Sequence, residues 1–171
     1  MVGQPDDTPR PDEGHSHGYG VIRKAPAART QVVRFYMPSG RDAVAQAVER
    51  VLDAVKPVGL RTGRRHDLAV AVSEALSNAA LHGNRLAPGS RVAVTVEVVP
   101  ETRAVVDVRD SGGGFDSSRL GDPTEPERLL APAGRGVYLM HALVDEVQYN
   151  RKGNRVRLTM NRRKPQRGRR G

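Results

Sequence analysis

The segment 64–82 constrains the fold most, because it has the pattern of one long amphipathic helix. Its apolar side chains recur every three or four residues and would form a single buried stripe: Leu68, Val72, Leu76 and Ala79. Gly83-Asn84 ends the pattern. A helix that buries such a stripe needs other elements to cover it, so the chain must supply a sheet or further helices around it.

Shorter elements precede and follow this helix. The apolar spacing and the β-branched runs predict a strand at 31–37, a helix at about 41–56, a hairpin of 91–99 with 104–108, a helix at about 136–144, and a last hairpin of 147–150 with 155–160. A polar loop containing three prolines is expected over 116–133. This mixture predicts an α+β two-layer sandwich, with a mixed, mostly antiparallel sheet and helices on one face.

Composition limits the core and the chemistry. A chain of 171 residues is long enough for one domain with a sizeable core. Aromatic residues make up only 4% and Trp is absent, so the core must be built mostly from Val, Leu and Ala. The sequence contains no Cys, which excludes disulfides, Cys-ligated zinc, iron–sulfur clusters and a Cys nucleophile.

The net charge of +9 comes from one end of the chain. Residues 151–171 hold ten basic and no acidic residues, which leaves 18 basic and 19 acidic residues in 1–150. We therefore expect a Pro/Gly-rich leader over 1–30, a domain over 31–160 and a basic tail over 161–171. Nucleic-acid binding is unlikely except through the tail. No apolar run approaches the ~20 residues that a membrane helix needs, and a cytoplasmic location is expected.

Three polar side chains share one edge of the predicted long helix. Glu74, Asn78 and His82 are spaced at four-residue intervals, so a carboxylate, an amide and an imidazole lie along one line. The neighbours of that line are small: Ala71, Ala75 and Ser77. An ordinary solvated face would explain such a line on most helices, but small neighbours leave room for a ligand.

Two glycine-rich segments follow at element boundaries. Asp110-Ser111-Gly112-Gly113-Gly114 comes at the end of a predicted strand, where glycines let backbone approach a ligand closely. Gly134-Arg135-Gly136 opens a predicted helix, whose free N–H groups attract phosphate. Taken alone, the first could be a capped turn and the second a helix-entry turn. The phosphate-loop pattern GxxxxGK[ST] is absent.

Together, in this order and at these distances, the three segments resemble the ATP-binding fold shared by gyrase, heat-shock chaperones, sensor histidine kinases and mismatch-repair proteins, the GHKL superfamily. The text from Ser73 to Gly83, from Asp110 to Phe115 and from Gly134 to Met140 is most similar to the small anti-sigma factor serine/threonine kinases of bacteria. That resemblance implies a histidine kinase-like fold over about 31–160, with ATP as the cofactor.

The resemblance also implies a role for each polar residue on the long helix. Asn78 would coordinate the Mg²⁺ that bridges the phosphates, because an amide oxygen is a suitable hard ligand. Glu74, one helical turn away, would act as general base or orient the attacking hydroxyl. His82 would lie at the edge of the nucleotide site, where a packing role is an equal alternative.

The glycine-rich segments would hold the two ends of the nucleotide. Asp110 would accept a hydrogen bond from the adenine amino group, with Gly112 and Gly114 beside the base. Gly134 and Gly136 would present N–H groups to phosphate. In the family a basic residue often precedes the final glycine pair; here Ala131-Pro132-Ala133 occupies that place, and Arg128 or Arg135 could supply the charge instead.

Such a lone nucleotide domain implies a partner-switching regulator. It would form a homodimer, hold a sigma factor and phosphorylate a Ser or Thr of an antagonist protein. Because no basic residue directly precedes the final glycine pair, a second hypothesis stays open: a nucleotide-gated binding protein with little or no kinase activity. A third hypothesis, nucleic-acid binding by the arginine-rich tail, is weakened by the lack of aromatic residues after Met160.

Overall fold

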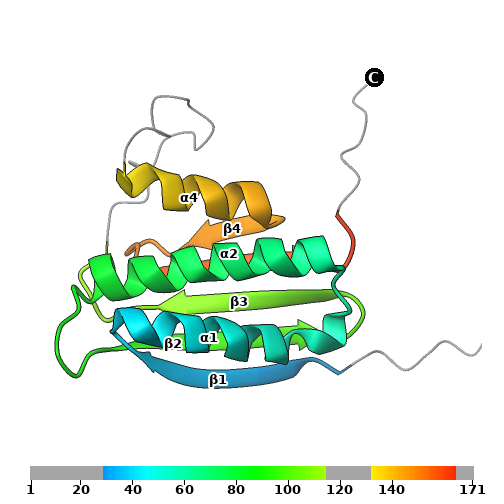
Figure 1. Ribbon diagram of the computed structural model, residues 1–171, viewed down its shortest axis with the longest axis horizontal. Helices are drawn as coiled ribbons and strands as arrows, with labels where there is room; N and C mark the ends of the chain where they lie inside the picture. Colours follow the sequence, from blue (N-terminus) through cyan, green and yellow to red (C-terminus); the bar gives the residue numbers. More distant parts are fainter. Residues whose placement is uncertain (1–28, 115–131, 165–171) are drawn as a thin grey trace, which may run out of the picture.

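The computed structural model describes residues 29–114 and 132–164. Most of the predicted leader, nearly all of the expected loop over 116–133 and the end of the basic tail lie outside these residues. The described part forms two layers, a sheet and a layer of helices (Figure 1).

The sheet has five strands in the order β1-β2-β3-β5-β4, and every neighbouring pair is antiparallel. The strands span Gln31–Pro38 (β1), Arg91–Val99 (β2), Arg103–Arg109 (β3), Glu146–Tyr149 (β4) and Arg155–Asn161 (β5). Each lies within two residues of its predicted bounds. Strand β5 ends one residue inside the segment expected to be tail.

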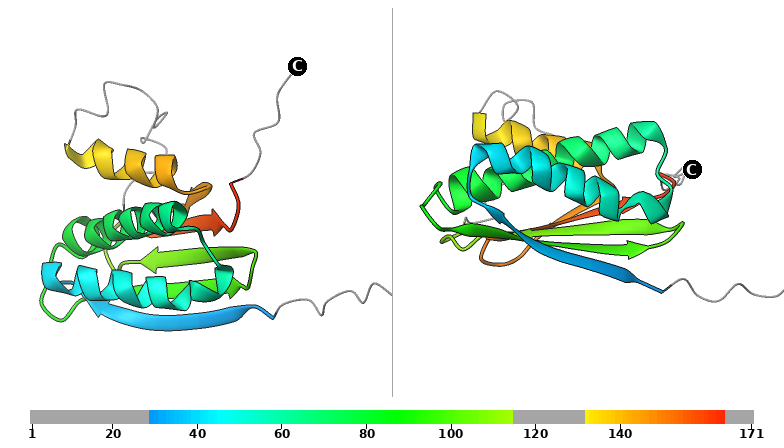
Figure 2. Two further views of the ribbon diagram at one scale, coloured as in Figure 1. Left: turned by 45° about the vertical axis from the view of Figure 1, so that its right-hand side comes forward. Right: turned by 60° about the horizontal axis from the view of Figure 1, so that its bottom comes forward.

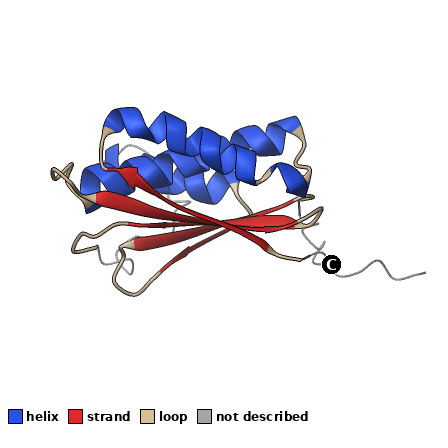
Figure 3. Ribbon diagram, turned by 90° about the horizontal axis from the view of Figure 1, so that it is seen from below, coloured by secondary structure: helices blue, strands red, loops and turns tan. Residues whose placement is uncertain are grey.

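The three helices α1 (Arg41–Ala54), α2 (Thr62–Asn78) and α4 (Pro132–Leu143) all lie on the same face of the sheet (Figures 2 and 3). A short 3-10 helix η1, Lys56–Val58, follows α1 and replaces the last turn predicted for it. The opposite face of the sheet carries no described helix. The predicted α+β two-layer sandwich is confirmed.

The core lies between the sheet and the helices. Along β2 the residues that alternate toward the helices are almost fully buried: Val92, Val94, Val96 and Val98. The predicted stripe of α2 is buried as well, with Leu68, Val72 and Leu76 wholly inaccessible. The core is therefore built largely from Val, Leu and Ala as composition predicts, with Met37, Met140 and Met160 added.

The predicted helix over 64–82 changes form at its end. Helix α2 stops at Asn78, and a π-helical turn, η2, runs from Ala79 to Gly83. Its wide turn is closed by the N–H of Asn84, which donates to the carbonyl oxygen of Ala79 at 2.8 Å. Such π turns are uncommon and occur often at functional sites. No apolar pattern in the sequence distinguishes one from an α-helical continuation.

Helix α4 packs against α2. Ala71 and Ala75, expected to leave room beside the polar line, are themselves buried, so the protein's own helix uses part of that room. At the other end, Arg64 of α2 bonds Asp145, which follows α4 and accepts a 2.7 Å bond from the N–H of Asn161. This contact fixes α4 against α2 and β5. Among the described residues, none of the helices is long and apolar enough to cross a membrane.

Candidate functional site

A cavity of about 330 Å³ lies between the helices and the sheet, at the end where α2 passes into η2. Its volume falls within the usual range for small-molecule sites. Four of the residues predicted from the sequence line it: Asn78, His82, Asp110 and Gly114. Glu74, Gly112, Arg135 and Gly136 do not line it, although the backbone brings Gly112 and Gly136 close to residues that do.

The walls of the cavity are mainly apolar. Ala75 and Ala79 come from the helix side, Val137 and Met140 from α4, and Val108 and Val156 from the sheet. Tyr149 also lines the cavity, and burial raises the pKa of its hydroxyl to about 12, so the phenol stays neutral at physiological pH. Such apolar walls are suited to pack against a flat, uncharged ring system of a ligand.

Asp110 is the one buried carboxylate on the cavity, in the part of the chain that the structure describes. Its Oδ1 accepts a 2.8 Å hydrogen bond from the N–H of Gly112. Burial raises the pKa of this carboxyl group, and the hydrogen bond from Gly112 opposes that shift in part. A buried carboxylate with lone pairs to spare is suited to accept a hydrogen bond from a ligand amine.

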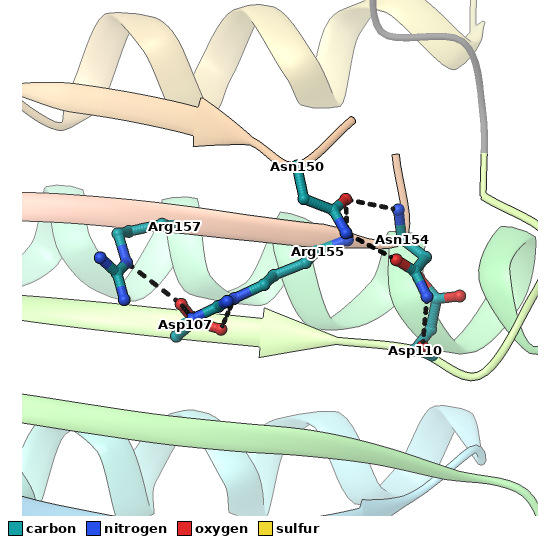
Figure 4. Close-up of polar contacts among 6 residues, drawn as sticks. All are labelled: Asp107, Asp110, Asn150, Asn154, Arg155 and Arg157. Carbon is teal, nitrogen blue, oxygen red and sulfur yellow. Dashed lines mark hydrogen bonds and ion pairs between the residues drawn. The ribbon is translucent and has the colours of Figure 1, made fainter. Parts of the chain in front are cut away.

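The backbone of Asp110 is held by the β4–β5 turn. Its N–H donates to the carbonyl oxygen of Asn154, and its own carbonyl oxygen accepts from Nδ2 of Asn154, both at 3.1 Å (Figure 4). Asn150 stabilises the β4–β5 turn, because its Oδ1 accepts hydrogen bonds from the N–H groups of Asn154 and Arg155. The sequence indicated only a hairpin here and gave no sign that its asparagines position Asp110.

Asn84 holds the other side of the same segment. Its Nδ2 donates to Oγ of Ser39 at 2.7 Å and to the carbonyl oxygen of Arg91 at 3.0 Å, and its Oδ1 accepts from the N–H of Ser111 at 2.9 Å. The side chain is only 6% exposed. Sequence reasoning treated Asn84 as a helix-stop signal and missed this role, which joins three separate segments beside the cavity.

The glycines near Asp110 are needed for close backbone contacts. A Cβ on Gly112 would lie 2.1 Å from the carbonyl oxygen of Gly83, and one on Gly114 would lie 1.9 Å from that of Lys152. Gly114 also has a φ of +76°, a conformation that disfavours other residues. The chain's own packing therefore accounts for both glycines. We call Asp110, Gly112, Gly114, Asn84 and Asn154 the aspartate end of the site.

A second group, which we call the glutamate end, consists of Glu74, Asn78 and Gly136. A Cβ on Gly136 would lie 2.7 Å from Oε2 of Glu74 and 3.5 Å from Nδ2 of Asn78, so α4 closely approaches both side chains. Neither Glu74 nor Asn78 makes a side-chain hydrogen bond to another residue within 29–114 and 132–164. Their polar atoms are thus available to a ligand.

Helix α4 begins earlier than predicted, at Pro132 rather than near Gly136. Pro suits the first turn of a helix, where its missing N–H costs nothing. Gly134 consequently lies in the first turn and Gly136 in the second. Arg135, between them, is exposed. Arg128, the other candidate for a phosphate-binding cation, lies outside the described residues.

The donor set at the glutamate end suits a hard divalent cation held jointly with phosphate. No cluster of three or more His, Asp or Glu side chains that could hold a metal alone occurs among the described residues. Mg²⁺ is usually bound by one or two protein oxygens together with phosphates and water. The half-buried amide of Asn78 on the cavity wall, with Glu74 one turn away, fits that requirement.

The described residues thus form two layers, with a cavity between α2, α4 and the sheet and a buried aspartate at a strand end. The chain belongs to the family described as histidine kinase-like ATPase domain, whose profile matches residues 37–160.

The chain is similar to several serine-protein kinases over about half of its length. The chain is 40% identical over 89 residues to the serine-protein kinase RsbW of Bacillus pumilus. The aligned residues make up 48% of this chain and 55% of the relative. It is 37% identical over 100 residues to the RsbW of Bacillus subtilis, covering 54% and 62%, and 31% identical over 90 residues to that of Oceanobacillus iheyensis, covering 49% and 56%. The chain thus spans little more than half the length of these relatives.

Proposed function

We propose that this protein is an ATP-dependent serine/threonine-protein kinase of the anti-sigma factor type. The observation that carries the proposal is that one cavity of about 330 Å³ is lined by Asn78 of the glutamate end and by Asp110 and Gly114 of the aspartate end. Its similarity to serine-protein kinases named RsbW supports the choice of a protein as phosphate acceptor.

In this proposal the aspartate end holds the base. Asp110 accepts a hydrogen bond from the adenine amino group, and the apolar walls from Val137 and Met140 pack against the ring. Gly134, Gly136 and the first N–H groups of α4 face phosphate, with Arg135 near them. His82, an exposed residue on the cavity wall, borders the site.

The glutamate end performs the transfer. Asn78 would hold Mg²⁺, which would supply positive charge beside the phosphates. Glu74 accepts the proton of the incoming Ser or Thr hydroxyl. The hydroxyl oxygen bonds to the γ-phosphorus, and the bond between the γ-phosphorus and the β–γ bridging oxygen breaks. The products are the phosphoprotein and ADP. The acceptor is an antagonist protein, and the kinase, as a homodimer, also binds a sigma factor.

The proposal is tested by recovering an antagonist protein in a pull-down and measuring the transfer of labelled γ-phosphate from ATP to it. Glu74→Ala should lower the transfer rate at least about 100-fold, whereas ATP binding measured by calorimetry should persist. Ser73→Ala, at the neighbouring half-buried position, is the matched control and should transfer normally. Transfer that survives Glu74→Ala would remove the role assigned to Glu74.

The lack of a basic residue directly before Gly134 favours a second candidate, a nucleotide-gated binding protein without useful kinase activity. Ala131-Pro132-Ala133 stands where the family often has a basic residue, and Arg135 is exposed. In that case ATP sets partner affinity instead of serving as a phosphate donor. Titration of ATP against partner binding, with Asp110→Asn as the nucleotide-binding variant, separates the candidates. Equal partner affinity with and without ATP would exclude this second one.

A further inference from the structure

The sheet face that the helices leave uncovered carries an unusual number of arginines. Strand residues alternate between the two faces, and the valines that face the helices set the parity for each strand. Six arginines occupy outward positions: Arg34, Arg91, Arg103, Arg109, Arg155 and Arg157. The acidic residues at outward strand positions are Glu97, Asp107 and Glu146, so this surface, the arginine face, has a net charge of +3.

Strand register concentrates the positive charge at one end of the arginine face. Tyr36, Ala93, Arg109 and Arg155 are successive Cα partners across β1, β2, β3 and β5. Arg109 and Arg155 are therefore directly opposite, where like charges destabilise a sheet. Arg91, two residues before Ala93 on the same face, adds a further positive charge to this end.

One carboxylate offsets part of this repulsion. Asp107 accepts two hydrogen bonds from Arg155, both at 2.7 Å, and one from Arg157 at 3.1 Å (Figure 4). The pair with Asp107 raises the pKa of Arg155, so its charge persists. Among the described residues, no carboxylate lies within ion-pair distance of Arg91 or Arg109. Two exposed guanidinium groups thus remain beside the compensated pair.

Apolar side chains adjoin these arginines at the sheet edge. Tyr36 and Val32 on β1 are 68% and 42% exposed and are two of three large apolar residues exposed in the described chain. Their outward positions place them on the arginine face beside β2. Arg and Tyr are the residue types enriched at the energetic centres of protein interfaces.

We propose that the arginine face docks a protein partner through an acidic surface with apolar residues at its margin. The partner's carboxylates would pair with Arg91 and Arg109 and relieve the repulsion from Arg155, while its apolar residues would cover Tyr36. Charge argues against a second copy of this chain, since two faces of +3 would repel one another. Three interspersed carboxylates and a single exposed aromatic argue against nucleic acid, which needs continuous positive charge and stacking groups.

The inference does not rest on kinase activity, because Arg91 and Arg109 do not line the cavity; of the six arginines, Arg155 alone does. Binding can therefore be measured without nucleotide. The probe is a synthetic helical peptide of about 20 residues, with Glu and Leu on one face, and its match with Gln replacing every Glu. The full-length, isotope-labelled chain is titrated with each peptide and followed by amide chemical shifts and by fluorescence anisotropy.

We expect shifts in β2, β3 and β5 with the Glu peptide, and weaker binding at higher salt. Arg91→Glu with Arg109→Glu should weaken binding at least about tenfold, which corresponds to about 1.4 kcal/mol. The matched control, Arg61→Glu with Arg65→Glu at the start of α2, makes the same change in net charge on exposed residues and should alter affinity less than about twofold. Every variant retains the basic tail, so the tail's attraction cancels in the comparison.

Several outcomes would overturn the proposal: equal weakening by both pairs, shifts confined to the helices or the tail, or equal binding of the Gln peptide. Tighter binding of a twelve-nucleotide single-stranded RNA that is lost in the Arg91/Arg109 pair would assign the face to nucleic acid instead. Self-association abolished by that pair, measured by sedimentation, would assign it to a second copy. If the glutamate variant does not fold by circular dichroism, Arg91→Gln with Arg109→Gln carries the test, with half the change in charge.

Discussion

The two ends of the candidate site are built differently. At the aspartate end, backbone packs on backbone at Gly112 and Gly114, and Asn84 and Asn154 tie Asp110 to distant segments. At the glutamate end, Glu74 reaches Gly136 with the tip of a flexible side chain. One end is fixed before any ligand arrives, which suits recognition of a rigid base, and the other can rearrange around phosphate and metal.

The largest effect should follow from filling a close backbone contact at the aspartate end. Gly112→Ala would place a methyl group 2.1 Å from the carbonyl oxygen of Gly83, and neither backbone can move without displacing Asp110. We expect a loss of about 3 kcal/mol in the free energy of unfolding, measured with urea. Gly113→Ala is the matched control, because nothing lies within 4 Å of its added Cβ; a change of less than about 0.5 kcal/mol is expected.

A smaller loss should follow from removing the side chain that joins three segments. Asn84→Ala deletes three hydrogen bonds and leaves the N–H of Ser111 without its acceptor. The expected cost is about 2 kcal/mol in the free energy of unfolding, with weaker ATP binding as well. A full loss of ATP affinity at unchanged stability would show that Asn84 contacts ligand rather than positioning Asp110.

The glutamate end should respond in the opposite manner. In Gly136→Ala the atoms nearest to the added methyl group belong to the side chains of Glu74 and Asn78, both of which can rotate away. We expect the free energy of unfolding to fall by less than about 1 kcal/mol, because the higher helix propensity of alanine offsets part of the cost of the new contact. Phosphotransfer should be slower because Glu74 is displaced. Destabilisation as large as that of Gly112→Ala would contradict the difference between the two ends.

The smallest effect concerns the charge of Asp110. Because its pKa is raised in the folded protein, the folded state binds the proton more tightly than the unfolded state, and stability falls as pH rises through the folded pKa. Asp110→Asn lacks this fall and keeps an acceptor for the N–H of Gly112. Without nucleotide, the variant should gain stability relative to the natural protein as pH increases, in urea titrations at several pH values. A gain that is independent of pH would show that Asp110 is not the titrating group.

Much of this architecture could be predicted from the sequence, because apolar spacing reports burial directly. The stripe of α2, the alternation in β2 and the two hairpins all follow from it. Helical spacing singled out Asn78 and His82, and its position at a strand end together with the family resemblance singled out Asp110; all three line the cavity. Spacing could not reveal the turn η2, since an inserted residue leaves no apolar signature, nor the roles of Asn84, Asn150 and Asn154, since asparagine is common in any turn. The arginine face was hidden too, because net charge averages over surfaces that only strand register separates.

The π-helical turn has a consequence for how the gene can change. The bond from Asn84 to Ala79 spans five residues, so the number of residues between Asn78 and Asn84 is fixed by geometry rather than by side-chain identity. Deleting a single codon there would convert the turn to an α-helical one and rotate Asn84 out of its contacts with Ser39, Arg91 and Ser111. Substitutions at exposed positions between Asn78 and Asn84 should be tolerated far better than an insertion or deletion of a residue there.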